Sequence, residues 1–183
     1  MKTVAEFLQR CVQCGLCMQV CPTAGLQPAW NEAGLEGLWS PVLVPAIGWC
    51  EFECHACGQV CPTEAIEPLP LEKKKKVNIG VAVIDTTRCL PWANQVPCVV
   101  CEEVCPVAPK AIQTYDEETK DVFGKMVILY KPFIVPDLCI GCGICEAECP
   151  VQDQPAVYVT AVGESRSKNR KLLLRSRTPA RPI

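Results

Sequence analysis

The sequence has little of what an enzyme of organic chemistry needs. It holds a single histidine among 183 residues, and it has neither a glycine-rich nucleotide loop nor a nucleophile beside a general base. Its apolar share of 49% includes 16 cysteines, and without them the share falls to about 40%, which is low for a globular domain. We therefore expect metal or disulfide bonds to supplement a small hydrophobic core.

Long apolar runs are absent as well. Prolines and polar residues interrupt the uncharged stretches, so no segment reaches the roughly 18 consecutive apolar residues of a membrane helix, and we expect that the chain does not span a bilayer. The first ten residues resemble neither a twin-arginine nor a Sec-type leader, which predicts a cytoplasmic protein, or a periplasmic one if a leader has been removed. The net charge of -2 gives no indication of nucleic-acid binding.

What the sequence has is cysteine, in four groups that each end in Cys-Pro. The groups lie around residues 11–22, 50–62, 89–106 and 139–150. The first and fourth groups have the spacing Cys-x2-Cys-x2-Cys-x3-Cys-Pro, whereas the first gap is x3 in the second group and x8 in the third. In chain order the cysteines are Cys11, Cys14, Cys17, Cys21, Cys50, Cys54, Cys57, Cys61, Cys89, Cys98, Cys101, Cys105, Cys139, Cys142, Cys145 and Cys149.

This spacing is typical of [4Fe-4S] binding. Three cysteines on one tight loop can reach three corners of an iron-sulfur cubane, while the cysteine before proline points away and binds the neighbouring cluster. Zinc sites usually have pairs of cysteines a dozen or more residues apart, often with histidine, and a disulfide framework suits an exported chain. We therefore predict that all sixteen cysteines bind four [4Fe-4S] clusters and that the chain has no catalytic residue.

The spacing leaves the partner of each group open. In a sequential arrangement the first group exchanges its last cysteine with the second group, and the third group does so with the fourth. In a nested arrangement the first group exchanges with the fourth, and the second with the third. Both arrangements complete four cubanes.

The segments between the groups predict a small, loop-rich α+β fold with short strands and short helices. Strands are expected at 81–85, 126–130, 133–135 and 157–160, and one or two helical turns are expected after each Cys-Pro, at 23–25, 63–66, 107–112 and 151–153. Two pairs of groups predict two fused units, each similar to a bacterial ferredoxin with two clusters. This body is expected over residues 1–163, and a basic C-terminal extension over residues 164–183.

The features outside the cysteines are interpreted as mainly structural. The lysine run at 73–76 is expected to be a solvated loop, with the steering of an acidic partner as the alternative. The extension has seven Lys and Arg residues around Leu172–Leu174, and we expect it to wrap a partner subunit rather than to bind an anionic surface. His55 is not needed as a ligand. The tryptophans Trp30, Trp39, Trp49 and Trp92 are expected to pack around the clusters.

The third group resembles that of the NapG/MauM-type polyferredoxins. The likeness runs from Phe7 to Val159 and is most specific in the segments GVAVID (80–85), CLPW (89–92) and CVVCEEVCP (98–106). The resemblance implies four [4Fe-4S] clusters and electron transfer between a membrane quinol-oxidising protein and a terminal enzyme. Related four-cluster subunits serve molybdenum or tungsten enzymes.

We therefore expect an electron-transfer protein that is not catalytic on its own and that relays single electrons through its clusters. Its expected partner is a redox subunit, either a molybdenum or tungsten enzyme or a membrane quinol dehydrogenase, in a hetero-oligomer of anaerobic metabolism. The alternative is a scaffolding subunit whose clusters mainly hold the fold together. A metal-dependent regulator is least favoured, because it would need a nucleic-acid-binding element.

Overall fold

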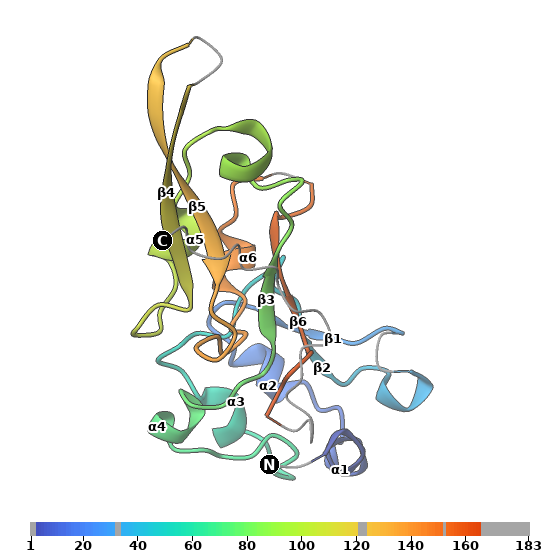
Figure 1. Ribbon diagram of the computed structural model, residues 1–183. Coiled ribbons are helices and arrows are strands. Elements are labelled where there is room, and N and C mark those ends of the chain that lie inside the picture. Colours follow the sequence, from blue (N-terminus) through green and yellow to red (C-terminus); the bar gives the residue numbers. More distant parts are fainter. Residues whose placement is uncertain (1–2, 32–33, 121–123, 152, 166–183) are drawn as a thin grey trace.

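Two-stranded antiparallel sheets form the framework of the chain. The computed structural model describes residues 3–31, 34–120, 124–151 and 153–165 (Figure 1). Within this part, β1 (Leu26–Pro28) pairs with β2 (Pro41–Leu43), β3 (Val81–Ile84) with β6 (Val157–Thr160), and β4 (Ile112–Lys120) with β5 (Met126–Ile134). The helical elements are α1 (Val4–Arg10), α2 (Leu16–Gln19), a 3-10 turn (Leu35–Gly37), α3 (Ala56–Gln59), α4 (Leu71–Lys74), a π-helical turn (Leu90–Asn94), α5 (Val100–Glu103) and α6 (Ile144–Ala147).

Each half of the chain contains antiparallel pairing. The β1–β2 pair lies between the first two cysteine groups, with Leu26 opposite Leu43. In the second half, β3 and β6 pair across a long stretch of sequence, with Val81 opposite Thr160. The β4–β5 hairpin lies between the third and fourth groups and extends away from the body in Figure 1. The small, mixed helix and strand architecture predicted from the sequence is confirmed.

The predicted strands of the second half are present with small changes of extent. The strands predicted at 81–85 and 157–160 correspond to β3 and β6. The two strands predicted at 126–130 and 133–135 are one continuous strand, β5, which passes through Lys131 and Pro132. Pro132 is opposite Thr114 in a hairpin of only two strands, and a proline is tolerated there because each strand has a free edge.

The predicted position of the helical turns is wrong. Each turn lies inside a cysteine group and contains its third cysteine: α2 holds Cys17, α3 Cys57, α5 Cys101 and α6 Cys145. Three of the four segments after Cys-Pro contain a residue with left-handed backbone angles instead: Ala24 at φ 54°, Glu64 at φ 52° and Asp153 at φ 68°. Helices of L-residues cannot continue through that conformation.

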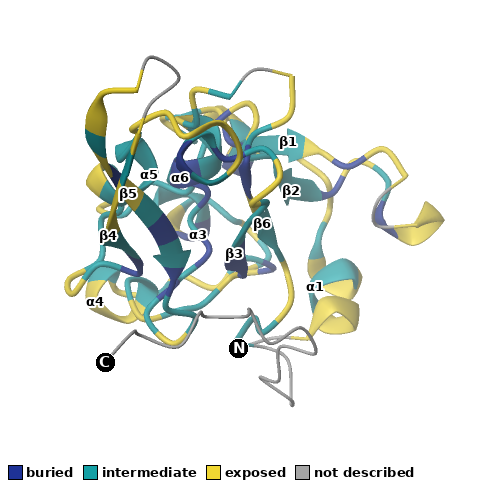
Figure 2. Cartoon of the chain, turned by 45° about the horizontal axis from the view of Figure 1, so that its top comes forward, coloured by how far each residue is buried: buried dark blue, intermediate teal, exposed yellow. Residues whose placement is uncertain are grey.

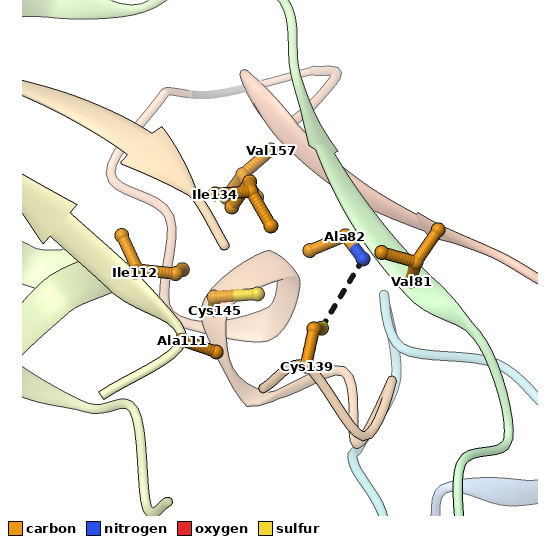
Figure 3. Close-up of a cluster of buried hydrophobic side chains, with 8 residues drawn as sticks. All are labelled: Val81, Ala82, Ala111, Ile112, Ile134, Cys139, Cys145 and Val157. Atoms are coloured by element: carbon orange, nitrogen blue, oxygen red, sulfur yellow. Dashed lines mark hydrogen bonds between the residues drawn. The ribbon is translucent and has the colours of Figure 1, made fainter. Parts of the chain in front are cut away.

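The main core is built partly from cysteine. Its buried members are Val81, Ala82, Ala111, Ile112, Ile134, Cys139, Cys145 and Val157 (Figure 3). They come from β3, β6, the base of the β4–β5 hairpin, the helix α6 and the cysteine loop that precedes it, and Figure 2 shows buried residues in these elements. The α1 helix, by contrast, buries none of its residues. The side chains that fill the core are therefore next to the cysteines that form the candidate sites.

Candidate iron-sulfur sites

The sixteen cysteines line four cavities, four to each. Every cavity combines the first three cysteines of one group with the Cys-Pro cysteine of another, and we name it after the latter. The Cys61 cavity has Cys11, Cys14 and Cys17; the Cys21 cavity has Cys50, Cys54 and Cys57; the Cys105 cavity has Cys139, Cys142 and Cys145; and the Cys149 cavity has Cys89, Cys98 and Cys101. The structure thus has the sequential arrangement, one of the two that the spacing left open.

The size of these cavities fits a cluster better than a single ion. The Cys61, Cys105 and Cys149 cavities each enclose between 330 and 370 Å³ of space free of protein atoms, part of it continuous with solvent. Among the described residues, no three His, Cys, Asp or Glu side chains gather in the way that a single metal ion needs. Four thiols spread around such a space suit the corners of a cubane.

Glycine shapes the loops of the first and fourth groups. Gly15 and Gly143 each follow the second cysteine of their group and have φ angles of 76° and 90°, and each precedes a helical turn. Side chains with a β-carbon rarely adopt this left-handed conformation. The same position is His55 in the second group and Val99 in the third, with φ angles of -139° and -129°. A left-handed glycine therefore shapes two of the four loops.

Backbone amides point at several sulfur atoms. The amide of Ala82 donates to Cys139 Sγ at 3.4 Å (Figure 3), and the amide of Ala156 donates to Cys149 Sγ at the same distance. The amide of Ile66 donates to Cys61 Sγ at 3.5 Å. Such hydrogen bonds stabilise negative charge on sulfur and are one of the means by which a protein tunes a cluster.

Threonine hydroxyls contact two of the Cys-Pro cysteines. Thr23 Oγ1 lies 3.5 Å from Cys21 Sγ, and Thr63 Oγ1 lies 3.8 Å from Cys61 Sγ. Burial acts to raise the pKa of the Cys61 thiol, but hydrogen bonds from the Ile66 amide and from Thr63 outweigh it and lower the pKa below its ordinary value. The pKa of Cys21 is lowered in the same way, with Thr23 opposing the effect of burial. Both sulfur atoms are therefore prepared to carry negative charge.

Other thiols lie in surroundings that raise their pKa rather than lower it. Burial, followed by the charge of neighbouring thiols, raises the pKa of Cys57 to about 11 and that of Cys101 to about 12. Burial also raises the pKa of Cys145, in a site where Cys142 and Cys139 contribute further negative charge. A buried thiolate needs a nearby cation. Iron would supply that positive charge at these sites.

Contacts between the loops place the four cavities in a row. The turn α2, which holds Cys17, contacts the turn α3, which holds Cys57, and α5 contacts α6 in the same way. The middle of the row is a backbone hydrogen bond between the loops of the second and fourth groups. The order along the row is the Cys61, Cys21, Cys105 and Cys149 cavities.

The lysine run is not the solvated loop that the sequence predicted. Lys73 and Lys76 are exposed, but Lys74 and Lys75 are half-buried against the second cysteine group. Lys74 Nζ donates to the carbonyl oxygens of Glu51 and Phe52, and Lys75 Nζ is 2.7 Å from a carboxylate oxygen of Glu53. Charge repulsion within a run favours a solvated loop only where no acceptors lie close by, and here backbone carbonyls and a carboxylate are available.

His55 has a structural role. Its Nδ1 is 2.8 Å from the carbonyl oxygen of Leu69, and its Nε2 is 3.1 Å from Gln59 Nε2. Both ring nitrogens are thus occupied by contacts other than the cysteines. The sequence-based interpretation, in which the histidine is not a ligand, agrees with this geometry.

The prediction that the tryptophans pack around the clusters holds for Trp49, which lines the Cys21 cavity. Trp92 lies one residue further out: it donates a hydrogen bond to the carbonyl oxygen of Pro132, and Pro132 lines the Cys149 cavity. Trp30 and Trp39 are 68% and 52% exposed and contact each other edge to face. The prediction that these two tryptophans pack around a cluster is therefore wrong. No periodicity distinguishes these two tryptophans from the others.

Two further predictions concern the chain as a whole. The basic extension, with Leu172–Leu174, lies outside the described residues from residue 166 onward. Before it, the hydroxyl of Ser165 accepts a hydrogen bond from the Asn78 amide at 2.8 Å. Among the described helices, none has the length and apolar character that crossing a bilayer requires.

Comparison with known proteins identifies similar sequences. Residues 8–27 and 132–152 match the model of the 4Fe-4S binding domain family; they contain the two groups with the regular spacing. Over 156 residues the chain is 35% identical to the methylamine utilization ferredoxin-type protein MauM of Methylorubrum extorquens, covering 84% of this chain and 67% of that protein. Over 154 residues it is 36% identical to the ferredoxin-type protein NapG of Escherichia coli, covering 84% of this chain and 64% of that protein. The MauM protein of Paracoccus denitrificans is 32% identical over 146 residues, which are 79% of this chain and 62% of that protein. The chain thus spans 62% to 67% of the length of these relatives.

Proposed function

Because the chain belongs to the family of ferredoxin-type proteins that includes MauM and NapG, we propose that it relays single electrons through four [4Fe-4S] clusters. The observation that carries this proposal is the gathering of the sixteen cysteines into four cavities of four, each with thiols from two groups. In this proposal all sixteen are ligands. When bound, a [4Fe-4S] cluster supplies reversible one-electron chemistry.

The residues of the chain have the task of binding and spacing the clusters. Four thiols at each cavity satisfy four iron atoms, which leaves no position for a substrate, so the proposed protein is not catalytic on its own. The row of cavities supports a path with two ends, at the Cys61 and Cys149 cavities. Cys14, in the first of these, is exposed, so the Cys61 end is a natural place for exchange with a partner.

The partner in this proposal is a redox subunit of a larger oxidoreductase complex. A membrane quinol dehydrogenase and a molybdenum or tungsten enzyme remain the two candidate classes, and anaerobic metabolism and a cytoplasmic location remain predictions of the sequence. Isolation of the chain from its native cells under anaerobic conditions, with the proteins that accompany it, identifies the partner. Fractionation of the same cells identifies the compartment.

The direct experiment measures iron, acid-labile sulfide and zinc in the anaerobically purified chain. We expect about sixteen iron and about sixteen sulfide per chain, as four cubanes require. Stepwise reduction, followed by electron paramagnetic resonance, should then show several clusters that change oxidation state. A preparation that contains zinc, or far fewer than four cubanes, contradicts the proposal.

A scaffolding function is the second candidate, and the composition of the core favours it. Cys139 and Cys145 are themselves buried core residues, so loss of a cluster at the Cys105 cavity would also disturb the packing of the fold. The two candidates differ in the reduction experiment. A scaffold needs no cluster that accepts an electron at physiological potentials, whereas a relay needs several.

A further inference from the structure

Two irregularities of the sequence meet in the structure. The first gap of the second cysteine group is one residue longer than in the first and fourth groups and consists of Glu51, Phe52 and Glu53. The lysine run holds this gap. Lys74 Nζ donates to the carbonyl oxygen of Glu51 at 2.5 Å and to that of Phe52 at 3.2 Å, while Lys75 Nζ lies 2.7 Å from Glu53 and 5.2 Å from the centre of the Phe52 ring.

The charges of the two lysines have different surroundings. Lys75 is paired with the carboxylate of Glu53 and lies 3.5 Å from that of Glu72, so its charge is largely compensated. The described contacts of Lys74 are with backbone carbonyl oxygens, which accept hydrogen bonds but carry no net charge. The ammonium group of Lys74 is therefore a fixed positive charge beside the loop that joins Cys50 to Cys54.

Lys74 is held beside a ligand thiol of the Cys21 cavity. Its Nζ binds the carbonyl oxygens of the two residues that directly follow Cys50 in the chain, and Cys50 lines the Cys21 cavity. Glu51 also lines the Cys21 cavity, and one of its carboxylate oxygens accepts a hydrogen bond of 3.2 Å from Trp49 Nε1.

We propose that Lys74, clamped over the extended gap of the second cysteine group, raises the reduction potential of the cluster bound at the Cys21 cavity. Reduction adds one negative charge to the cluster, and a fixed cation on the loop that carries two of its ligands stabilises that reduced state. Lys74 is thus a positioning and tuning residue and not a ligand. The inference rests on the proposed function, since it requires a cluster at this cavity.

A raised potential at the Cys21 cavity affects the direction of electron transfer along the row. The Cys21 cavity is the second of four in the row, so an electron that enters at the cluster of the Cys61 cavity passes to it next. A higher potential at that point favours transfer away from the Cys61 end. Two residues of the lengthened gap, Glu51 and Phe52, supply the carbonyl oxygens that hold the lysine in place.

The experiment is a redox titration of the cluster-loaded chain, read by electron paramagnetic resonance, for the original protein and for Lys74→Met. We expect the equilibrium constant for reduction of one cluster to fall about tenfold, which is about 59 mV for a one-electron couple. Lys73→Met is the matched control, because Lys73 belongs to the same run and is exposed. The Lys73→Met variant makes the same change in net charge and should leave the reduction potentials of all four clusters unchanged.

Two more variants separate charge from structure. Lys74→Arg retains the charge and should retain the potential. Lys74→Gln removes the charge but keeps a hydrogen-bond donor for the carbonyl oxygens, and it should reproduce the shift of Lys74→Met with all iron retained. Equal potentials in the Lys74→Met and Lys73→Met variants overturn the inference, as does loss of the cluster in both the Met and the Gln variants, which would make Lys74 a structural clamp. Absence of [4Fe-4S] clusters from the original protein overturns the proposed function instead, so the two failures are distinguishable.

Discussion

The backbone amide of Cys50 donates a hydrogen bond of 2.8 Å to the carbonyl oxygen of Cys142. The bond joins the second cysteine group to the fourth, which lies in the other half of the chain. It makes neighbours of the Cys21 and Cys105 cavities and turns two pairs of cavities into one row. Without such a junction, a chain with four clusters would contain two separate relays.

The row predicts which clusters interact magnetically. The Cys54→Ala variant should lose the cluster of the Cys21 cavity and leave the cluster of the Cys61 cavity alone at one end, with an uncoupled signal in the fully reduced state. The Cys14→Ala variant should lose the end cluster and leave three neighbours coupled. Electron paramagnetic resonance measures the difference, with Cys98→Ala as the control at the opposite end. An isolated signal in the Cys14→Ala variant but not in Cys54→Ala would reverse the order.

The sequential arrangement predicts how losses of iron combine. The Cys61→Ala variant should lose about four iron atoms, because a cubane with three thiols is labile. Adding Cys14→Ala should cause no further loss, since both thiols line one cavity, whereas adding Cys98→Ala should double it to about eight. Iron analysis of the single and double variants tests this. In a nested arrangement Cys61 and Cys98 would share a cluster, and the two results would be exchanged.

A close backbone approach predicts a sensitive glycine. A β-carbon on Gly141 would lie 2.5 Å from the backbone of Gly80, and φ there is 71°. Gly163 has a similar φ of 78° but open space around it. We expect Gly141→Ala to cost about 2 kcal/mol more than Gly163→Ala, because only the former adds a clash between two backbone segments to the conformational cost. The loss of cluster absorbance in guanidinium chloride measures the two costs, and equal values would contradict the close approach.

The raised thiol pKa values predict that iron is held less tightly at lower pH. Burial raises the pKa of Cys57, Cys89 and Cys142 to about 11, so protons compete with iron for these sulfur atoms at every pH below that value. Each unit of pH then changes the thiolate fraction of such a thiol about tenfold. Transfer of iron to a chelator should be faster at pH 7 than at pH 9, once the pH dependence of the chelator itself is subtracted. A rate independent of pH would show that proton competition is not a determinant.

The positions of the helical turns illustrate what local sequence could and could not predict. The strands β3 and β6 were predictable because their β-branched residues fit a pleated surface. The helical turns predicted after Cys-Pro do not form, because Ala24 and Glu64 adopt left-handed backbone angles. Neither residue type favours such angles in isolation, so local sequence could not predict them. The cysteine loops fold back so that their thiols face a common cavity, and that requirement overrides local preference. The contacts of Lys74 were equally hidden, because the carbonyl oxygens it binds are more than 20 residues away along the chain.

By itself, the sequence determined the number of cysteine groups, the chemistry of their thiols and the small, mixed helix and strand architecture. These follow from spacing and composition, which are local properties. The tertiary structure decided which Cys-Pro cysteine joins which group, how the four cavities are ordered and where the lysine run lies. Each of these depends on contacts between segments far apart in the chain, and the free energy of such contacts comes from burial and hydrogen bonding that no local pattern encodes.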